Sequence, residues 1–267
     1  ALPEVRPSSG RFGTTDAASG VPGGIPVSGV AGDQQAALFG QACFEAGTTK
    51  NTYGTGSFVL MNVGSECPEP VEGLLTTVGW SIGAVDSAST TYALEGAIFS
   101  TGSTIQWLRD GVGLLADSAG SEWWDPYARG TVVGITRGTT RAHLARAAVE
   151  AMVFQTRDVV DAMSAASGHH VAALRADGGA SVMALLLQLQ ADQLGVTVSR
   201  PECEETTALG AAYLAGLAEG VWSSTQEVVD NWRLSAEFEP QADRAAADAA
   251  YATWRRAVER SLAWAAD

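Results

Sequence analysis

The amino-acid sequence predicts an α/β domain built on a mixed β-sheet flanked by helices. Short β-prone segments crowd the first hundred residues, whereas helical and strand-like segments alternate in the second half. This order is typical of a sheet that contains both antiparallel and parallel strands. The chain has 267 residues, of which 46% are hydrophobic and 17% charged. It is therefore long enough to bury a sizeable core.

The elements of the first half are predicted from turn residues and local alternation. Residues 1–24 are rich in Pro, Ser and Gly and are interpreted as a segment that enters from an absent N-terminal domain. The turn Gly54-Thr55-Gly56 between two β-prone runs predicts a hairpin. The predicted strands cover 24–31, 49–53, 57–62, 74–80 and 90–96. Two helices are predicted in this half: one begins at Asp33, and the other covers 98–110.

The second half loses a clear pattern over 111–122 and then carries a polar and aromatic turn over 123–130. A long helix is predicted over 141–166, where Leu144, Ala148 and Met152 recur near one face and indicate a core stripe. The alanine-rich helix predicted over 208–219 has small residues that suit close helix packing. The other predicted elements are strands over 131–135, 171–176 and 196–198 and helices over 180–194 and 242–266.

The charge balance argues against two classes of partner. The net charge is −14 and the isoelectric point about 4.5, which disfavours nucleic-acid binding and docking on anionic lipid. An anionic ligand stays possible, because backbone N–H groups hold phosphate without a basic surface. Lys50 is the only lysine, and we interpret the preference for arginine as compositional bias.

Cysteine usage and hydropathy indicate a cytoplasmic protein. Cys43, Cys67 and Cys203 lie far apart, without a Cys-x-x-Cys pair, so we expect neither a zinc site nor a disulfide framework. No segment is apolar and long enough to span a bilayer.

Asp33 is the first candidate for chemistry. It follows Gly32 where the strand ends and the helix begins, a place where free backbone N–H groups favour negative charge. One interpretation is that Asp33 caps the helix, as aspartate commonly does there. The other is that its carboxylate acts in a site.

Two glycine-containing turns are further candidates. Gly54-Thr55-Gly56 allows close approach of an anion to the backbone, although most such turns only join two strands. Asp177-Gly178-Gly179-Ala180 joins a strand to a helix and lets a nucleotide lie over the backbone. Met183, one turn later, either contacts a ligand or packs inward; we favour packing. The phosphate-binding pattern Gly-x-x-x-x-Gly-Lys is absent.

The order of motifs along the chain is more specific than any one of them. The motifs are GDQQAALFGQ (32–41), KNTYGTG (50–56), YALEG (92–96), IQWLRD (105–110), WDPYARG (124–130), FQTRD (154–158), DGGA (177–180) and TALGAAY (207–213). This series closely resembles the C-terminal half of the glycerol kinases, a branch of the FGGY carbohydrate kinase family, from about Pro3 to the end.

This resemblance implies an actin-like, ribonuclease-H-like domain over 25–267 that binds ATP with Mg²⁺ and phosphorylates glycerol. It implies that Asp33 is the general base, that Gln34 hydrogen-bonds glycerol and that Phe58 contacts its carbon atoms. It also implies that the nucleotide is bound by a second set of residues: Thr55, Gly102, Gln106, Gly178, Gly179 and Met183. It implies no protein side chain as a metal ligand.

The chain departs from the family in several places. The N-terminal domain is absent, so we expect this chain alone to lack a closed site. A strand and a glycine-rich loop are expected between Glu122 and Trp123 but do not occur. Met183 replaces a usual asparagine, and the Gly20–Pro26 region lacks a basic residue that serves regulation in some relatives.

Two alternative functions stay open at this point. The first is a kinase for another small polyol, since substrate choice depends largely on the absent half. The second is a non-catalytic module that binds a nucleotide or a partner. Relatives often form dimers or tetramers, so the resemblance also implies a possible homo-oligomer.

Overall fold

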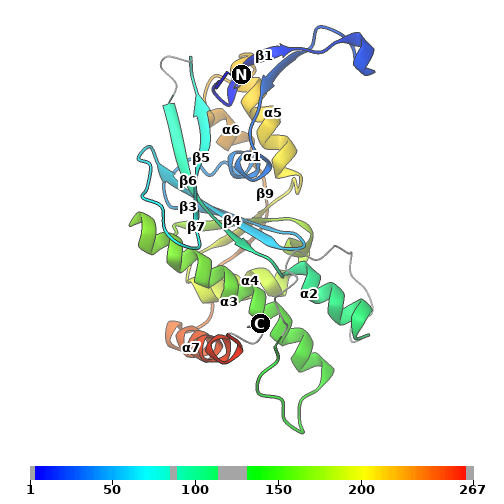
Figure 1. Cartoon of the computed structure of the whole chain (residues 1–267), viewed down its shortest axis with the longest axis vertical. Helices are drawn as coiled ribbons and strands as arrows, with labels where there is room; N and C mark the ends of the chain where they lie inside the picture. The colour runs from blue at the N-terminus through cyan, green and yellow to red at the C-terminus, as the bar shows by residue number, and fades with distance from the viewer. Residues whose placement is uncertain (1–3, 85–88, 114–130, 263–267) are drawn as a thin grey trace.

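The computed structural model describes residues 4–84, 89–113 and 131–262. Within these residues it has a nine-stranded mixed sheet with helices packed on both faces (Figure 1). The predicted α/β class with a mixed sheet is therefore confirmed. The strands are β1 (Ser9–Thr14), β2 (Pro26–Gly29), β3 (Thr48–Tyr53), β4 (Ser57–Gly64), β5 (Leu75–Ile82), β6 (Ser89–Ile98), β7 (Ala173–Asp177), β8 (Val198–Pro201) and β9 (Leu234–Phe238).

The helices that cover the sheet come from all parts of the chain. Two short 3₁₀ turns occur at Ala17–Ser19 and Gly179–Val182, and α2 continues into a π-helical turn over Trp107–Gly111. The α-helices are α1 (Asp33–Gly40), α2 (Gly102–Gln106), α3 (Arg141–Ser167), α4 (Ala184–Leu194), α5 (Thr206–Ala218), α6 (Thr225–Asn231) and α7 (Arg244–Ser261).

The central strand of the sheet is β3. The strand order is β2-β1-β5-β6-β4-β3-β7-β8-β9, and β3 pairs antiparallel with β4 and parallel with β7. The carboxyl ends of parallel strands lie at the same edge of a sheet. The turn after Tyr53 and the glycines after Asp177 therefore meet at one edge.

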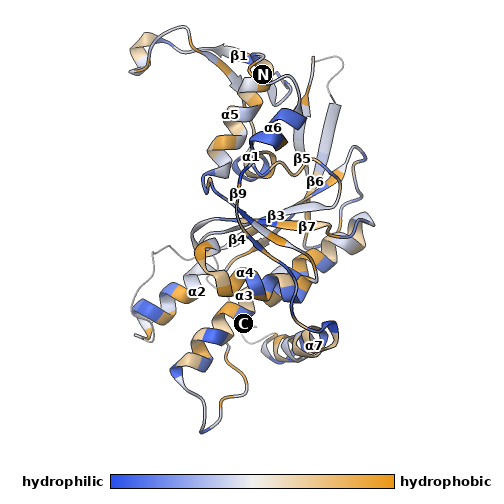
Figure 2. Cartoon of the chain, turned by 180° about the vertical axis from the view of Figure 1, so that it is seen from behind, coloured by the Kyte–Doolittle hydropathy of each residue, from blue (hydrophilic) through white to orange (hydrophobic). Residues whose placement is uncertain are grey.

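The two faces of the sheet have separate cores. Helices α1 and α5 cover one face, and α3 and α4 cover the other (Figure 1). Alternation along β4 sends Leu60 to the α1 face and Val59 and Met61 to the α3 face. Figure 2 shows α5 as largely hydrophobic, as its burial requires, and α6 as hydrophilic.

Helices α1 and α5 cross at glycine. A β-carbon on Gly210 would lie 2.6 Å from the carbonyl carbon of Ala36 and 2.9 Å from the nitrogen of Gly40. The two backbones are therefore too close for any side chain at this position. The predicted close packing of the alanine-rich helix is confirmed.

Several predicted boundaries are wrong, and each has a physical reason. The predicted helix 98–110 begins only at Gly102, because Ile98 still pairs with Ser57 in the sheet. Residues 131–135 form no strand, because they are exposed and have no partner strand in the described part of the chain. The sequence analysis also missed β1, α6 and β9. The predictions for 114–130, including the Glu122–Trp123 junction, lie outside the described residues.

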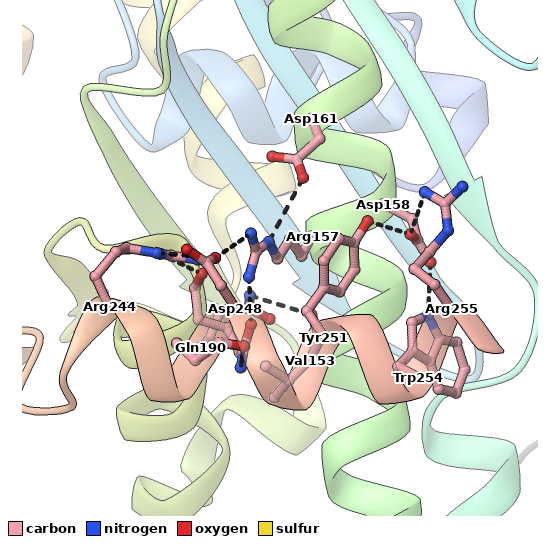
Figure 3. A network of polar contacts seen from close by, with 12 residues as sticks. Val153, Arg157, Asp158, Asp161, Gln190, Arg244, Asp248, Tyr251, Trp254 and Arg255 are labelled. Carbon is pink, nitrogen blue, oxygen red and sulfur yellow. Dashed lines mark hydrogen bonds and ion pairs between the residues drawn. The ribbon is translucent and has the colours of Figure 1, made fainter. Parts of the chain in front are cut away.

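A polar network holds α7 against α3 and α4 (Figure 3). Arg157 donates to Asp248 at 2.7 Å and to Gln193 at 2.9 Å, and its guanidinium lies 4.0 Å from the centre of the Tyr251 ring. Asp158 accepts from Trp254 at 2.9 Å and also from the Tyr251 hydroxyl. Hydrogen bonds from Arg244 and Arg157 hold the pKa of Asp248 well below its ordinary range.

We expect Asp248→Asn to loosen α7 and to lower the melting temperature at pH 7. A carboxyl whose pKa is lower in the folded state adds stability above its ordinary pKa of about 4, and this stability is lost as the pH falls below that value. The melting temperatures of the variant and the wild type should therefore draw closer as the pH falls below 4, and meet only once the pH has fallen through the lowered pKa of Asp248. Equal melting temperatures at pH 7 would show that the network does not hold the helix.

Candidate functional site

The carboxylate of Asp33 is exposed at the beginning of α1. Gly32 is the N-cap residue and Asp33 the first residue of the helix, so the capping interpretation is wrong. Asp33 accepts hydrogen bonds from the backbone N–H of Gln34 at 2.8 Å and from the Gln34 side-chain amide at 3.2 Å. These bonds fix the carboxylate and leave it open to solvent.

Lys50 lies directly behind Gln34. Its side chain is fully buried on β3, and its ammonium donates to Oε1 of Gln34 and to the hydroxyl of Thr52 at 2.9 Å. The ammonium thus connects the central strand of the sheet to the first turn of α1.

Burial changes the protonation of this lysine. Loss of solvent lowers the pKa of Lys50 to about 8, against the nearby negative charges of Asp177, Glu95 and Asp33, which favour the charged form. Burial also raises the pKa of Glu95, and the charge of Lys50 partly offsets that effect. The two groups influence one another across the α1 face of the sheet.

Sheet register places Phe58 on this same face. Thr52 pairs with Phe58 across β3 and β4, and Lys50 pairs with Leu60, which in turn pairs with Glu95 on β6. Paired residues of neighbouring strands point to the same side of a sheet. We call Asp33, Gln34, Lys50, Phe58 and Glu95 the α1-face cluster. Phe58 is 36% exposed, so it offers an apolar surface there.

Three of the predicted nucleotide-side residues meet around the β3–β4 turn. A β-carbon on Gly178, whose φ is +83°, would lie 2.7 Å from the carbonyl oxygen of Tyr53, and Gly102 packs equally closely on Gly54. The N–H groups of Gly102 and Ser103 donate to the carbonyls of Gly54 and Thr55. The structure therefore brings Thr55, Gly102 and Gly178 together.

The other three residues predicted to bind the nucleotide pack less closely on the β3–β4 turn. Gly179 has open space around it, and Met183 is half-buried and packs against the core, as the favoured interpretation expected. Gln106 is the last residue of α2 and half-buried. Among the described residues, no group bonds the N–H or the hydroxyl of Thr55.

Two hollows lie at opposite ends of α1. One, of about 320 Å³, is lined by Gly32, Gln35 and Val78 among others, and Asp33 follows Gly32 in the chain. The other, of about 200 Å³, lies beyond Gly40. Neither is lined by any of the predicted site residues. We assign the site to the first end, because the exposed carboxylate and the α1-face cluster are there.

Lys50 and Glu95 are the residues of this site that sequence reasoning missed. The alternation of the predicted hairpin already placed Lys50, Thr52 and Phe58 on one face. What the sequence did not show is that α1 and α5 cover that face and bury the lysine.

Two kinds of feature are not found in the described ranges 4–84, 89–113 and 131–262. They hold no cluster of three or more His, Cys, Asp or Glu side chains that could bind a metal ion. They also hold no helix long and apolar enough to cross a membrane.

Comparisons with known proteins agree with this geometry. Residues 119–219 match the model of the C-terminal domain of the FGGY family of carbohydrate kinases. The glycerol kinase of Carboxydothermus hydrogenoformans is 51% identical over 288 residues, which cover 98% of this chain and 57% of that protein. The chain thus spans little more than half the length of this relative. The alignment is also longer than the chain's 267 residues, so the relative has residues with no counterpart here.

Comparison with solved structures also shows similarity to kinases of this family over about half of their length. The Plasmodium falciparum glycerol kinase, crystallised with ADP, superimposes with a TM-score of 0.88 at 31% identity, covering 98% of this chain and 56% of that one. A xylulose kinase from Rhodospirillum rubrum, at 22% identity, shares the fold with a TM-score of 0.77 and covers 96% of this chain and 56% of its own. The fold is therefore of the expected actin-like kind. The chain belongs to the FGGY family of carbohydrate kinases and carries the C-terminal domain of that family.

Proposed function

We propose that this chain is the C-terminal half of a kinase that transfers the γ-phosphoryl group of ATP to glycerol and forms glycerol 3-phosphate. The exposed Asp33 carboxylate, fixed by Gln34 at the beginning of α1, is the observation that carries the proposal. An N-terminal domain, absent from this chain, would supply the second wall of the site. The similarity to glycerol kinases supports the choice of substrate.

In this proposal Asp33 is the general base. A base must lie within hydrogen-bond reach of the proton that it removes, and this carboxylate is exposed where a substrate hydroxyl can approach it. Gln34 would hydrogen-bond a glycerol hydroxyl, and the exposed ring of Phe58 would contact the carbon atoms. Phosphoryl transfer otherwise requires that the two substrates are positioned and that the negative charge of the phosphates is neutralised.

The nucleotide would lie at the turn that follows β3. The N–H and hydroxyl of Thr55, which have no partner among the described residues, and the open space at Gly179 fit the close approach of a phosphate or a nucleotide to the backbone. Gly102, Gln106, Gly178 and Met183 would line that side. The ADP in the Plasmodium falciparum structure supports a nucleotide ligand for this family member.

Mg²⁺ would enter with the nucleotide. The described residues offer no cluster of metal-ligating side chains, and Mg²⁺ in kinases takes many of its ligands from phosphate and water. Its chemistry would be to neutralise charge on the phosphates. A cytoplasmic location and a homo-oligomeric state stay predictions.

A test joins this chain to the part of the Carboxydothermus hydrogenoformans glycerol kinase that precedes its match. We expect the fusion to form glycerol 3-phosphate from ATP and glycerol, and this chain alone to form none. Phosphorylation of a different polyol would support the first alternative. Nucleotide binding without turnover on any polyol would support a non-catalytic module.

A further inference from the structure

The only lysine of the chain occupies a position where a charged side chain is hard to accommodate. The chain has 16 basic residues, and all except Lys50 are arginines. Lys50 is fully buried and sits between the sheet and the first turn of α1. Burying an ammonium group costs free energy unless its donors are satisfied. Compositional bias explains the arginines but not this single lysine.

The contacts of Lys50 determine how the amide of Gln34 is oriented. An ammonium group donates hydrogen bonds and accepts none, so the amide must turn Oε1 toward Lys50. The amide nitrogen then points to the other side, where it donates to Oδ2 of Asp33 at 3.2 Å. The three groups form a chain of donors that runs from Lys50 through Gln34 to Asp33.

We propose that Lys50 is a positioning residue of the kinase site, whose ammonium orients Gln34 so that Gln34 holds the Asp33 carboxylate toward the substrate hydroxyl. This inference rests on the proposed function. Lys50 acts through Gln34 and touches no reacting atom. A neutral amine could also accept a hydrogen bond, and the amide would then lose its fixed orientation.

The charges around Lys50 make this arrangement sensitive to pH. The groups that face it are Asp33 from α1, Glu95 from β6, Cys43 from the α1–β3 connection, and Asp177 and Arg175 from β7. The pKa of Lys50 is lowered to about 8 by burial despite its acidic neighbours. The ammonium form therefore predominates below pH 8 and is lost as the pH rises past that value.

The first test measures Lys50 in this chain alone. Because the chain has one lysine, ¹³C-labelled lysine gives one side-chain signal to titrate by NMR. We expect a midpoint near 8, moved lower by Gln34→Leu, which removes an acceptor from the ammonium. Gln35→Leu is the matched control, because Gln35 donates to Thr77 instead. A midpoint near the ordinary 10.4, or one that Gln34→Leu does not move, overturns the contact.

The second test measures turnover in the fusion described above. We expect Lys50→Met to lower kcat by roughly tenfold to a hundredfold, as loss of an orienting outer group does in metal sites, with less effect on KM. The loss of kcat above pH 8 in the wild type should be absent from the variant. Thr49→Val is the control, because Thr49 is equally buried on β3 but points to the opposite face.

The two tests separate this inference from the proposed function. An active wild-type fusion in which Lys50→Met keeps the wild-type kcat and pH profile overturns the inference alone. A wild-type fusion without activity overturns the proposed function, and the NMR titration then decides whether Lys50 orients Gln34.

Discussion

Asp33→Asn should lower the kcat of the complete kinase by about 10²- to 10⁴-fold, the range for loss of a general base. The carbonyl oxygen of asparagine can still accept the hydrogen bond from the Gln34 backbone, so the beginning of α1 should keep its geometry. An amide cannot take the proton of the attacking hydroxyl. The measurement is steady-state formation of glycerol 3-phosphate by the fusion, together with the KM for ATP, which should hardly change.

Stability gives the control for this result. We expect the unfolding free energy of Asp33→Asn to stay within about 0.5 kcal/mol of the wild type, as for other exposed substitutions. Asp16→Asn is a matched variant, because Asp16 lies on the β1–β2 connection, which stands away from the sheet (Figure 1). It should keep full activity. Turnover by Asp33→Asn within tenfold of the wild type would sink the assignment of the base.

Gly210→Ala should destabilise the fold by about 3 kcal/mol, the upper part of the range for overpacking. The new methyl group would meet the backbone of Ala36 and Gly40, and backbone atoms cannot rotate away as a side chain can. Alanine is the better helix former by about 1 kcal/mol, but this gain is smaller than the cost of separating two helices. Denaturant unfolding of this chain measures the difference.

Gly13→Ala is the matched control for Gly210→Ala. A β-carbon at Gly13 meets nothing within 4 Å, so this substitution should change stability by less than about 0.5 kcal/mol. Separation of α1 from α5 also moves the helix that carries Asp33. If Gly210→Ala were as stable as the wild type, the close crossing of the two helices would be wrong.

Local chemistry explains which elements the sequence could predict. The β3–β4 hairpin was predicted correctly because Gly54-Thr55-Gly56 specifies a turn between two β-prone runs, and both strands form as expected. The predicted helix start at residue 98 was wrong because pairing of Ile98 with Ser57 is a long-range contact. Residues 131–135 have β-propensity but no partner strand within the described ranges, and propensity without a partner does not make a strand.

In the site, too, features set by local sequence were predicted and features set by long-range packing were missed. Asp33, Gln34 and Phe58 were predicted through motifs, and the structure places Gln34 against Asp33 and Phe58 on the same face of the sheet as Lys50. Lys50 lies inside one of those motifs and was still overlooked, because its importance comes from burial under α1. The packing of α1 on the sheet buries the ammonium group of Lys50 and fixes its contacts, and neither effect can be predicted from the local sequence.

The pairing of β3 on both sides has a consequence for how such enzymes diversify. Strand β4 pairs with β3 on one side and β7 on the other, so the backbone of the turn that follows Tyr53 is anchored from both. Phe58 lies on the return strand of the same hairpin, opposite Thr52. A family built on such an anchored hairpin can exchange the side chains beside the substrate while the backbone of the turn stays in place. New substrates then require different lining side chains but no new scaffold.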